Sequence, residues 1–110
     1  MKDDLSLLNH ILDSIERIQK YVEVGEKVFM ADTMVQDAVI RNFEIIGEAV
    51  KGLSEEIKDR NPTVPWKQIS GMRDFLIHVY FGVKLETVWE TIGDLVELKK
   101  AVEIELTTHS

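Results

Sequence analysis

Apolar residues recur at three- and four-residue steps along most of the chain, which is the spacing of one face of an α-helix. In the first such segment they are Leu5, Leu8, Ile11, Leu12, Ile15, Ile18 and Val22. Asp3 or Asp4 is well placed to cap this helix at its N-terminus, and Gly25 is expected to break it. The segment therefore predicts one amphipathic helix.

A second helix is predicted to begin near Asp32 and Thr33 and to be the longest of the chain. Its apolar stripe consists of Val35, Ala38, Val39, Phe43, Ile46, Val50 and Leu53. The pattern leaves its end open, either around Gly52 or after the stretch "SEEIKDRNP".

Prolines and glycines delimit two more helices. The stretch "NPTVPW" predicts a turn because Pro62 and Pro65 lack a backbone donor, and Pro65 suits the first turn of the next helix. This third helix is expected to run to about Tyr80 and to stop at Gly82. The fourth has the apolar stripe Leu85, Val88, Trp89, Ile92, Leu95, Val96 and Val102.

Strand-like alternation of apolar and polar residues is missing throughout the sequence. Four helices joined by short loops predict an all-α fold, and the most economical arrangement is an antiparallel up-and-down four-helix bundle. The 110 residues contain no internal repeat, low-complexity stretch or linker, so residues 1–110 are expected to form a single domain.

Composition narrows the function classes. A formal net charge of −7 argues against tight non-specific binding to nucleic acid, so no DNA binding is expected and a role on RNA needs a local cleft. The sequence has no cysteine and no apolar run approaching ~20 residues, and its N-terminus lacks the features of a secretory signal. We therefore expect a cytoplasmic protein without a membrane segment. His10, His78 and His109 are too scattered for metal ligation, so neither a metal nor a cofactor is expected.

The stretch "GMRDFLIHVYFG" places Arg73, Asp74, His78 and Tyr80 within an otherwise apolar helix. Arg73 and Tyr80 are two turns apart and share a face, whereas Arg73 and His78 diverge by roughly 140°. Either the helix distorts or ends near His78, or a second copy brings its own Arg73 and His78 into a shared cleft. Asp74 lies four residues before His78, a spacing at which its carboxylate can orient the imidazole.

A structural interpretation of the same residues stays open from the pattern alone. Arg73 and Asp74 then form solvated ion pairs, His78 is a hydrogen-bonded core residue, and Tyr80 packs its ring with its hydroxyl at the surface. A polar stripe on the second helix also allows two interpretations, either a salt-bridged face exposed to solvent or the lining of a cleft. It consists of Asp37, Arg41, Glu44 and Glu48.

The segment "GMRDFLIHVYFGVKLETVWETI" closely resembles the signature of HepT-like proteins of the HEPN superfamily, in which Arg, four residues, His, one residue and Tyr follow one another. Arg73, His78 and Tyr80 match this spacing. The resemblance extends to "QDAVIRNFEIIGEAVKGL" and "PWKQISGMRD", so it covers roughly residues 30 to 95. Asp74 is a departure, since many relatives have Asn there, and it is expected to weaken binding of an anionic substrate at most.

The resemblance implies a HEPN-like four-helix domain that dimerises through the bundle and acts as a metal-independent endoribonuclease. His78 is implied as the general base or acid, and Arg73 as the residue that holds the scissile phosphate. It also implies that Arg41, Asn42 and Glu48 help to line the cleft. The expected products are a 2',3'-cyclic phosphate and a 5'-hydroxyl.

Such an RNase is commonly the toxin of a toxin-antitoxin pair, whose antitoxin is a minimal nucleotidyltransferase. Tyr80 matches the tyrosine that this partner modifies with AMP, which would place negative charge beside Arg73. A second hypothesis is a non-catalytic binding module that pairs with the nucleotidyltransferase, and a third is a purely structural helical dimer. Trp66 and Trp89 are expected in the core or dimer interface, and His10 and His109 at the surface.

Overall fold

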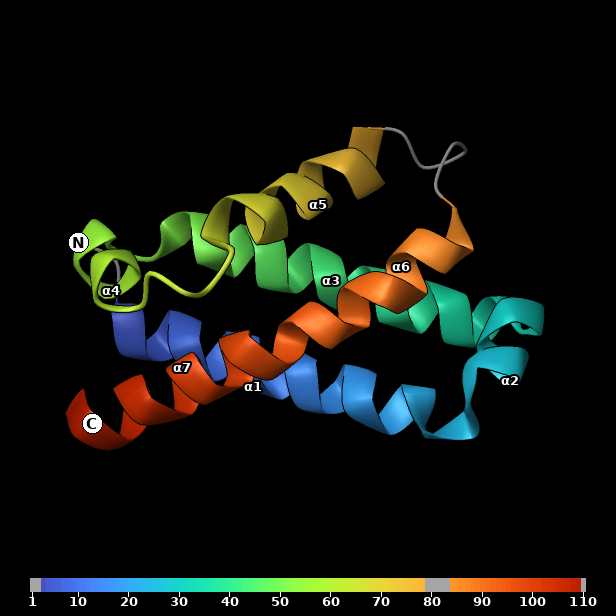
Figure 1. Cartoon of the computed structure of the whole chain (residues 1–110), viewed down its shortest axis with the longest axis horizontal. Helices are drawn as coiled ribbons and strands as arrows, with labels where there is room; N and C mark the ends of the chain where they lie inside the picture. The colour runs from blue at the N-terminus through green and yellow to red at the C-terminus, as the bar shows by residue number, and fades with distance from the viewer. Residues whose placement is uncertain (1–2, 79–83, 110) are drawn as a thin grey trace.

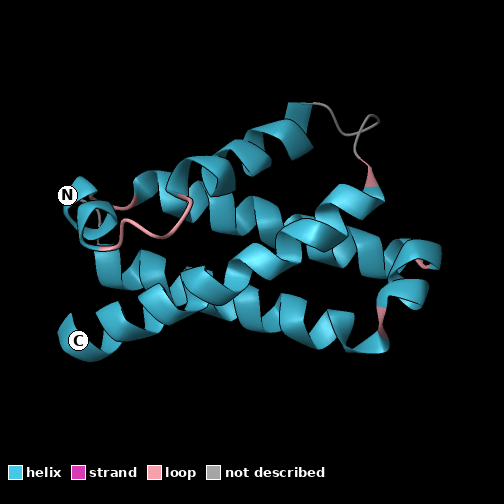
Figure 2. Ribbon diagram, in the orientation of Figure 1, coloured by secondary structure: helices cyan, strands magenta, loops and turns pink. Residues whose placement is uncertain are grey.

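The computed structural model describes the backbone of residues 3–78 and 84–109 and the side chains of residues 3–72 and 84–108. Four long helices run alternately up and down the molecule, as Figure 1 shows: α1 (Asp4–Tyr21), α3 (Thr33–Gly52), α5 (Trp66–His78) and α7 (Leu95–His109). The described residues are helical or in loops, without a strand (Figure 2). The predicted all-α antiparallel bundle is therefore confirmed. No described helix is long and apolar enough to cross a membrane.

Acidic side chains start the first two long helices, as the sequence predicts. The Asp3 carboxylate accepts a hydrogen bond from the backbone N–H of Leu5, and the Asp32 carboxylate accepts from Met34 and Val35. These bonds satisfy amide donors that have no partner within the helix. Gly25 ends the first helical segment with a φ of 93°, a conformation that side chains with a Cβ rarely adopt.

The core forms where α1 and α3 pack together, with α5 covering a second side of α3 and α7 covering α1. The apolar positions predicted for α1 and α3 supply most of the centre of this core. Its residues include Leu8, Ile11, Ile15, Ile18, Val39, Phe43, Ile46, Val50, Leu95, Leu98 and Val102, each at most 3% exposed. Trp66 and Trp89 are half-buried against it, and His10 is exposed, in agreement with the sequence.

Three short helices were not predicted. α2 (Glu26–Ala31) and α4 (Glu55–Arg60) follow α1 and α3, so the second long helix ends at Gly52. The fourth predicted helix was wrong in its bounds, because a 3₁₀ turn over Ile92–Asp94 separates α6 (Leu85–Thr91) from α7. Gly93 sits in this turn, and its lack of a Cβ weakens the preference for continuous helix.

Helices α2 and α6 are anchored by one aromatic pair. The ring centroids of Phe29 and Trp89 are 5.2 Å apart with the planes tilted by 43°. Phe29 is fully buried, and its carbonyl accepts a hydrogen bond of 2.9 Å from the Gln36 amide of α3. The turn of α2 is thereby joined to both neighbouring helices.

A buried carboxylate ties α4 and the start of α5 to α7. Glu105 has a side chain only 6% exposed, and it accepts hydrogen bonds from Arg60 at 2.7 and 3.2 Å and from the Asn61 amide at 3.0 Å. Asn61 in turn accepts, through its carbonyl, a bond of 3.0 Å from the Trp66 indole N–H. The hydrogen bonds of Glu105, followed by those of Glu56, raise the pKa of the Arg60 guanidinium above its ordinary value. These bonds therefore favour the charged form of Arg60.

Substitution of this carboxylate is expected to destabilise the fold. Glu105→Gln leaves the Arg60 fork without its buried anion, so the urea midpoint of unfolding falls clearly. Glu56→Gln is the matched control, because Glu56 also bonds Arg60 at 2.8 Å but is 80% exposed, and its midpoint stays close to wild type. Equal midpoints for the two variants would contradict the proposed role of burial.

Candidate functional site

Helix α5 carries three polar residues of the candidate site, Arg73, Asp74 and His78, and the structure describes their backbone. It begins directly after Pro65, whose carbonyl accepts the first helical bond from Ile69 at 3.0 Å. The helix continues through Arg73 and Asp74 to His78, its last residue. The side chains of these three residues lie outside the described part of the structure, and so does all of Tyr80.

The backbone of α5 decides one question that the sequence left open. Every residue from Trp66 to His78 is in α-helical conformation, so the helix is regular between Arg73 and His78. Positions 73 and 78 therefore lie roughly 140° apart around the helix axis. No distortion between these two residues brings them together, but the helix ends at His78, so a change of chain direction there and a second copy of the chain both remain as alternatives.

The polar stripe of α3 lies on the side of the helix opposite the core. Arg41 has a side chain 71% exposed, and its guanidinium is 3.5 Å from the Glu44 carboxylate. Glu48 is also exposed. Both are accessible to a large ligand, and the pairing of Arg41 with Glu44 is weak because it is long and exposed to water.

Asn42 differs from its neighbour Arg41, because consecutive helical residues are 100° apart and this one turns inward. It is 5% exposed. Its Nδ2 donates to the Ala38 carbonyl at 2.8 Å, but its Oδ1 has no hydrogen-bond partner among the described residues. A buried acceptor without a partner costs about 1–3 kcal/mol, so its presence in the core needs a reason beyond packing.

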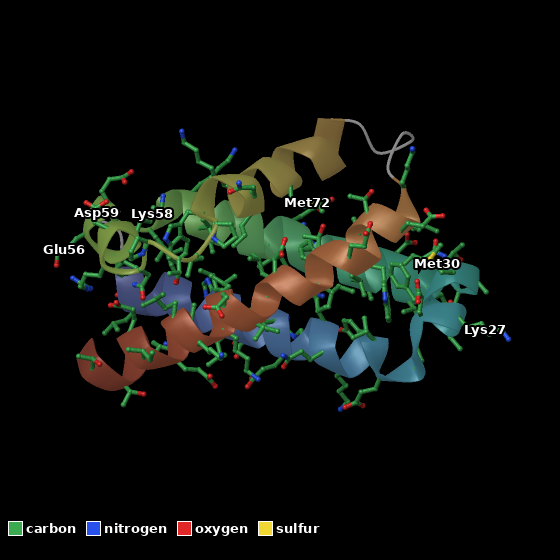
Figure 3. All side chains as sticks on the ribbon, in the orientation of Figure 1. Lys27, Met30, Glu56, Lys58, Asp59 and Met72 are labelled. Carbon is green, nitrogen blue, oxygen red and sulfur yellow. The ribbon has the colours of Figure 1, made fainter. Side chains whose placement is uncertain are left out.

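A groove between α5 and α6 was not predicted from the sequence. It has a volume of about 490 Å³ and is lined by Gln68, Ile69, Gly71 and Met72 of α5 and by Thr87, Thr91 and Asp94. Figure 3 labels Met72 on the side of α5 that faces the bundle. No sequence pattern signals the groove, because its two walls are separated along the chain and meet only in the fold.

The described residues contain no group of three or more His, Cys, Asp or Glu side chains that gather to hold a metal ion. Among the described residues that line the groove, Asp94 is the ionisable one.

Comparison with known proteins gives consistent matches. A family model described as "Ribonuclease HepT-like" matches residues 11–104. The "Putative RNase" of Caldanaerobacter subterraneus subsp. tengcongensis is 44% identical over 105 residues, which cover 94% of each chain. The "Probable ribonuclease HepT" of Thermococcus cleftensis is 41% identical over 98 residues, covering 87% of this chain and 89% of its own.

A relative from Methanocaldococcus jannaschii has a longer chain. It is described as "Gamma-glutamylcyclotransferase and putative RNase" and is 45% identical over 105 residues. The match covers 93% of the present chain but 47% of the relative, so the chain spans about half the length of that protein. No solved structure gives a significant match.

The buried amide of Asn42 yields a stability prediction. Asn42→Leu replaces it with an apolar side chain of similar shape, which removes the unpartnered acceptor and raises the free energy of unfolding by about 1 kcal/mol. Asn9→Leu is the matched control, because Asn9 makes the same bond to the carbonyl four residues earlier but is exposed, and its effect stays within about 0.5 kcal/mol. Urea denaturation measures both, and a marked loss of stability in Asn42→Leu would show that the amide holds the fold together.

Proposed function

Because the chain belongs to the HepT-like ribonuclease family, we propose that it is a metal-independent endoribonuclease that cleaves RNA with Arg73 and His78. The observation that carries the proposal is the family match over residues 11–104, which includes both positions in a helix that the structure describes. The ribonuclease names of the relatives support the same activity.

The reaction needs little from the protein, because RNA carries its own nucleophile. The 2'-hydroxyl attacks the adjacent phosphorus, the bond to the 5'-oxygen breaks, and a 2',3'-cyclic phosphate and a 5'-hydroxyl remain. His78 acts as general base or acid, since the ordinary pKa of an imidazole lies near neutrality. Arg73 holds the phosphate, because a guanidinium remains charged and donates two parallel hydrogen bonds to its oxygens.

We propose that the site is shared between two copies of the chain. The regular helix of α5 separates positions 73 and 78 by roughly 140°, which supports an arrangement in which one copy supplies Arg73 and its partner supplies His78. A two-fold axis creates two such sites. Asp74 supports the imidazole from the preceding turn, and Arg41, Asn42 and Glu48 of α3 belong to the surroundings of the cleft.

The same sequence motif offers a point of control. We propose that a nucleotidyltransferase antitoxin transfers AMP from ATP to the Tyr80 oxygen, with release of pyrophosphate. Tyr80 follows Arg73 by seven residues in the sequence, and an added phosphate would compete with RNA for Arg73. The alternative is a binding module that pairs with this partner and cuts no RNA. The net charge of −7 favours it, because an acidic protein binds RNA weakly.

Cleavage of total cellular RNA in EDTA tests the enzymatic proposal. Wild-type protein is expected to cut and to leave cyclic phosphate ends, whereas His78→Ala loses about 10²-fold or more of the rate because its proton-transfer group is gone. His10→Ala is the matched control, since His10 is exposed on α1, and it retains full activity. Undiminished cleavage by His78→Ala would overturn the assignment. If neither protein cuts, the binding module gains support, and Tyr80 is followed by mass spectrometry with the partner and ATP.

A mixing experiment tests the shared site. Arg73→Ala and His78→Ala are each expected to be inactive alone, but a heterodimer retains one site with both residues intact. An equimolar mixture, refolded together, therefore recovers about a quarter of the wild-type rate, because half the dimers are mixed and each has one of two sites. An inactive mixture whose subunits have demonstrably exchanged would place both residues of each site in one copy.

A further inference from the structure

The groove between α5 and α6 has the character of a small-ligand site. Its volume of about 490 Å³ lies within the range typical of such sites. Ile69 is buried and Met72 half-buried, so they form an apolar floor. A Cβ at Gly71 would have no described atom within 4 Å, apart from the neighbouring residues in the chain and the local helix backbone. The floor is therefore open to a flat apolar group.

Polar groups on the rim of the groove are available to a ligand. The side chains of Gln68, Thr87 and Asp94 have no hydrogen-bond partner among the residues that the structure describes. Thr91 donates its hydroxyl proton to the Thr87 carbonyl at 2.7 Å, so its oxygen is left as an acceptor. The rim thus offers one carboxylate, one amide and two hydroxyl oxygens around an apolar floor.

The groove borders the helix positions of both Arg73 and His78. Gly71, at one edge of the groove, precedes His78 by seven residues, which brings the two positions within roughly 20° of each other around the axis and about 10 Å apart along it. Ile69, at the other edge, precedes Arg73 by four residues, which brings these two positions within roughly 40° of each other and about 6 Å apart along the axis. A ligand in the groove is consequently near both positions in the same copy.

We propose that this groove binds a nucleobase of the RNA beside the cleavage site and that it selects guanine. The inference rests on the proposed ribonuclease function and adds a substrate preference to it. A phosphate is disfavoured because the Asp94 carboxylate carries the same charge. A guanine presents two neighbouring N–H donors on its Watson–Crick edge, which pair with the two oxygens of one carboxylate, while its ring lies over Met72 and Gly71.

Binding of oligoribonucleotides that cannot be cut tests this proposal separately from catalysis. The probes are short single strands with 2'-O-methyl groups throughout, each carrying one G, A or C within a run of U. Wild-type protein is expected to bind the G probe roughly tenfold more tightly than the others. Asp94→Asn keeps the shape but loses the charge, so this preference falls to near unity, while affinity for the run of U is maintained.

Two further variants complete the experiment. Gly71→Leu fills the groove without placing its Cβ against another described atom, and it is expected to remove the G preference. Asp13→Asn is the matched control, because Asp13 is exposed on α1, and it retains the preference. Equal binding of all probes by wild type would overturn the proposal, as would an unchanged preference in Asp94→Asn. A Gly71→Leu variant with an altered oligomeric state and an unchanged G preference would also overturn the proposal, because a second copy of the chain would then occupy the groove.

The two proposals fail in different ways. RNA cleavage that depends on His78 but shows no guanine preference in binding leaves the ribonuclease intact and removes the nucleobase site. Guanine-selective binding that depends on Asp94, without cleavage of any RNA, leaves the nucleobase site and removes the nuclease. Mapping of cut positions at nucleotide resolution then shows whether cleavage by wild type falls next to guanine and loses that bias in Asp94→Asn.

Discussion

The apolar face of α3 is too wide for one helix to cover. Its buried positions extend from Asn42 and Ala49 on one flank to Ile40 and Gly47 on the other, an arc of roughly 180°. An apolar stripe that faces a single neighbour needs little more than about 100°. Burial of this face therefore requires two partners, and α1 and α5 supply them (Figure 1). The position of α5, and with it of the candidate site, depends on this requirement.

Arrangement around α3 also explains how polar groups are distributed. The helix presents Arg41, Glu44 and Glu48 away from the core and keeps one amide, Asn42, inside it. An amide acceptor without a partner works against stability, and such groups are often kept where function needs them. Asn42 belongs to a sequence block that resembles the HepT-like family, and its proposed role near the cleft would account for a buried amide at this position.

The ends of α5 are held by different means. At its start, Glu105, Asn61 and Trp66 link α7 to the first turn through buried or half-buried hydrogen bonds. Toward its other end, the interruption at Gly93 separates α6 from α7, and the groove opens between α5 and the α6 wall. A tethered start and an open flank would suit the proposed role of α5 in presenting Arg73 and His78 to RNA. The groove borders the helix positions of both residues.

Local sequence determined α1 and α3 with their acidic caps and the start of α5 after Pro65, because caps, prolines and apolar spacing are properties of neighbouring residues, but it joined α6 and α7 into one helix. It also determined the family, since Arg73, His78 and Tyr80 stand at a fixed spacing within three matching blocks. It did not determine the short helices, because six or seven residues are too few for a periodic signal. Tertiary structure decided the regularity of α5, the burial of Asn42 and Glu105, and the groove that ends at Asp94. Each of these depends on which segments far apart in the sequence pack together, and a pattern of near neighbours contains no such information.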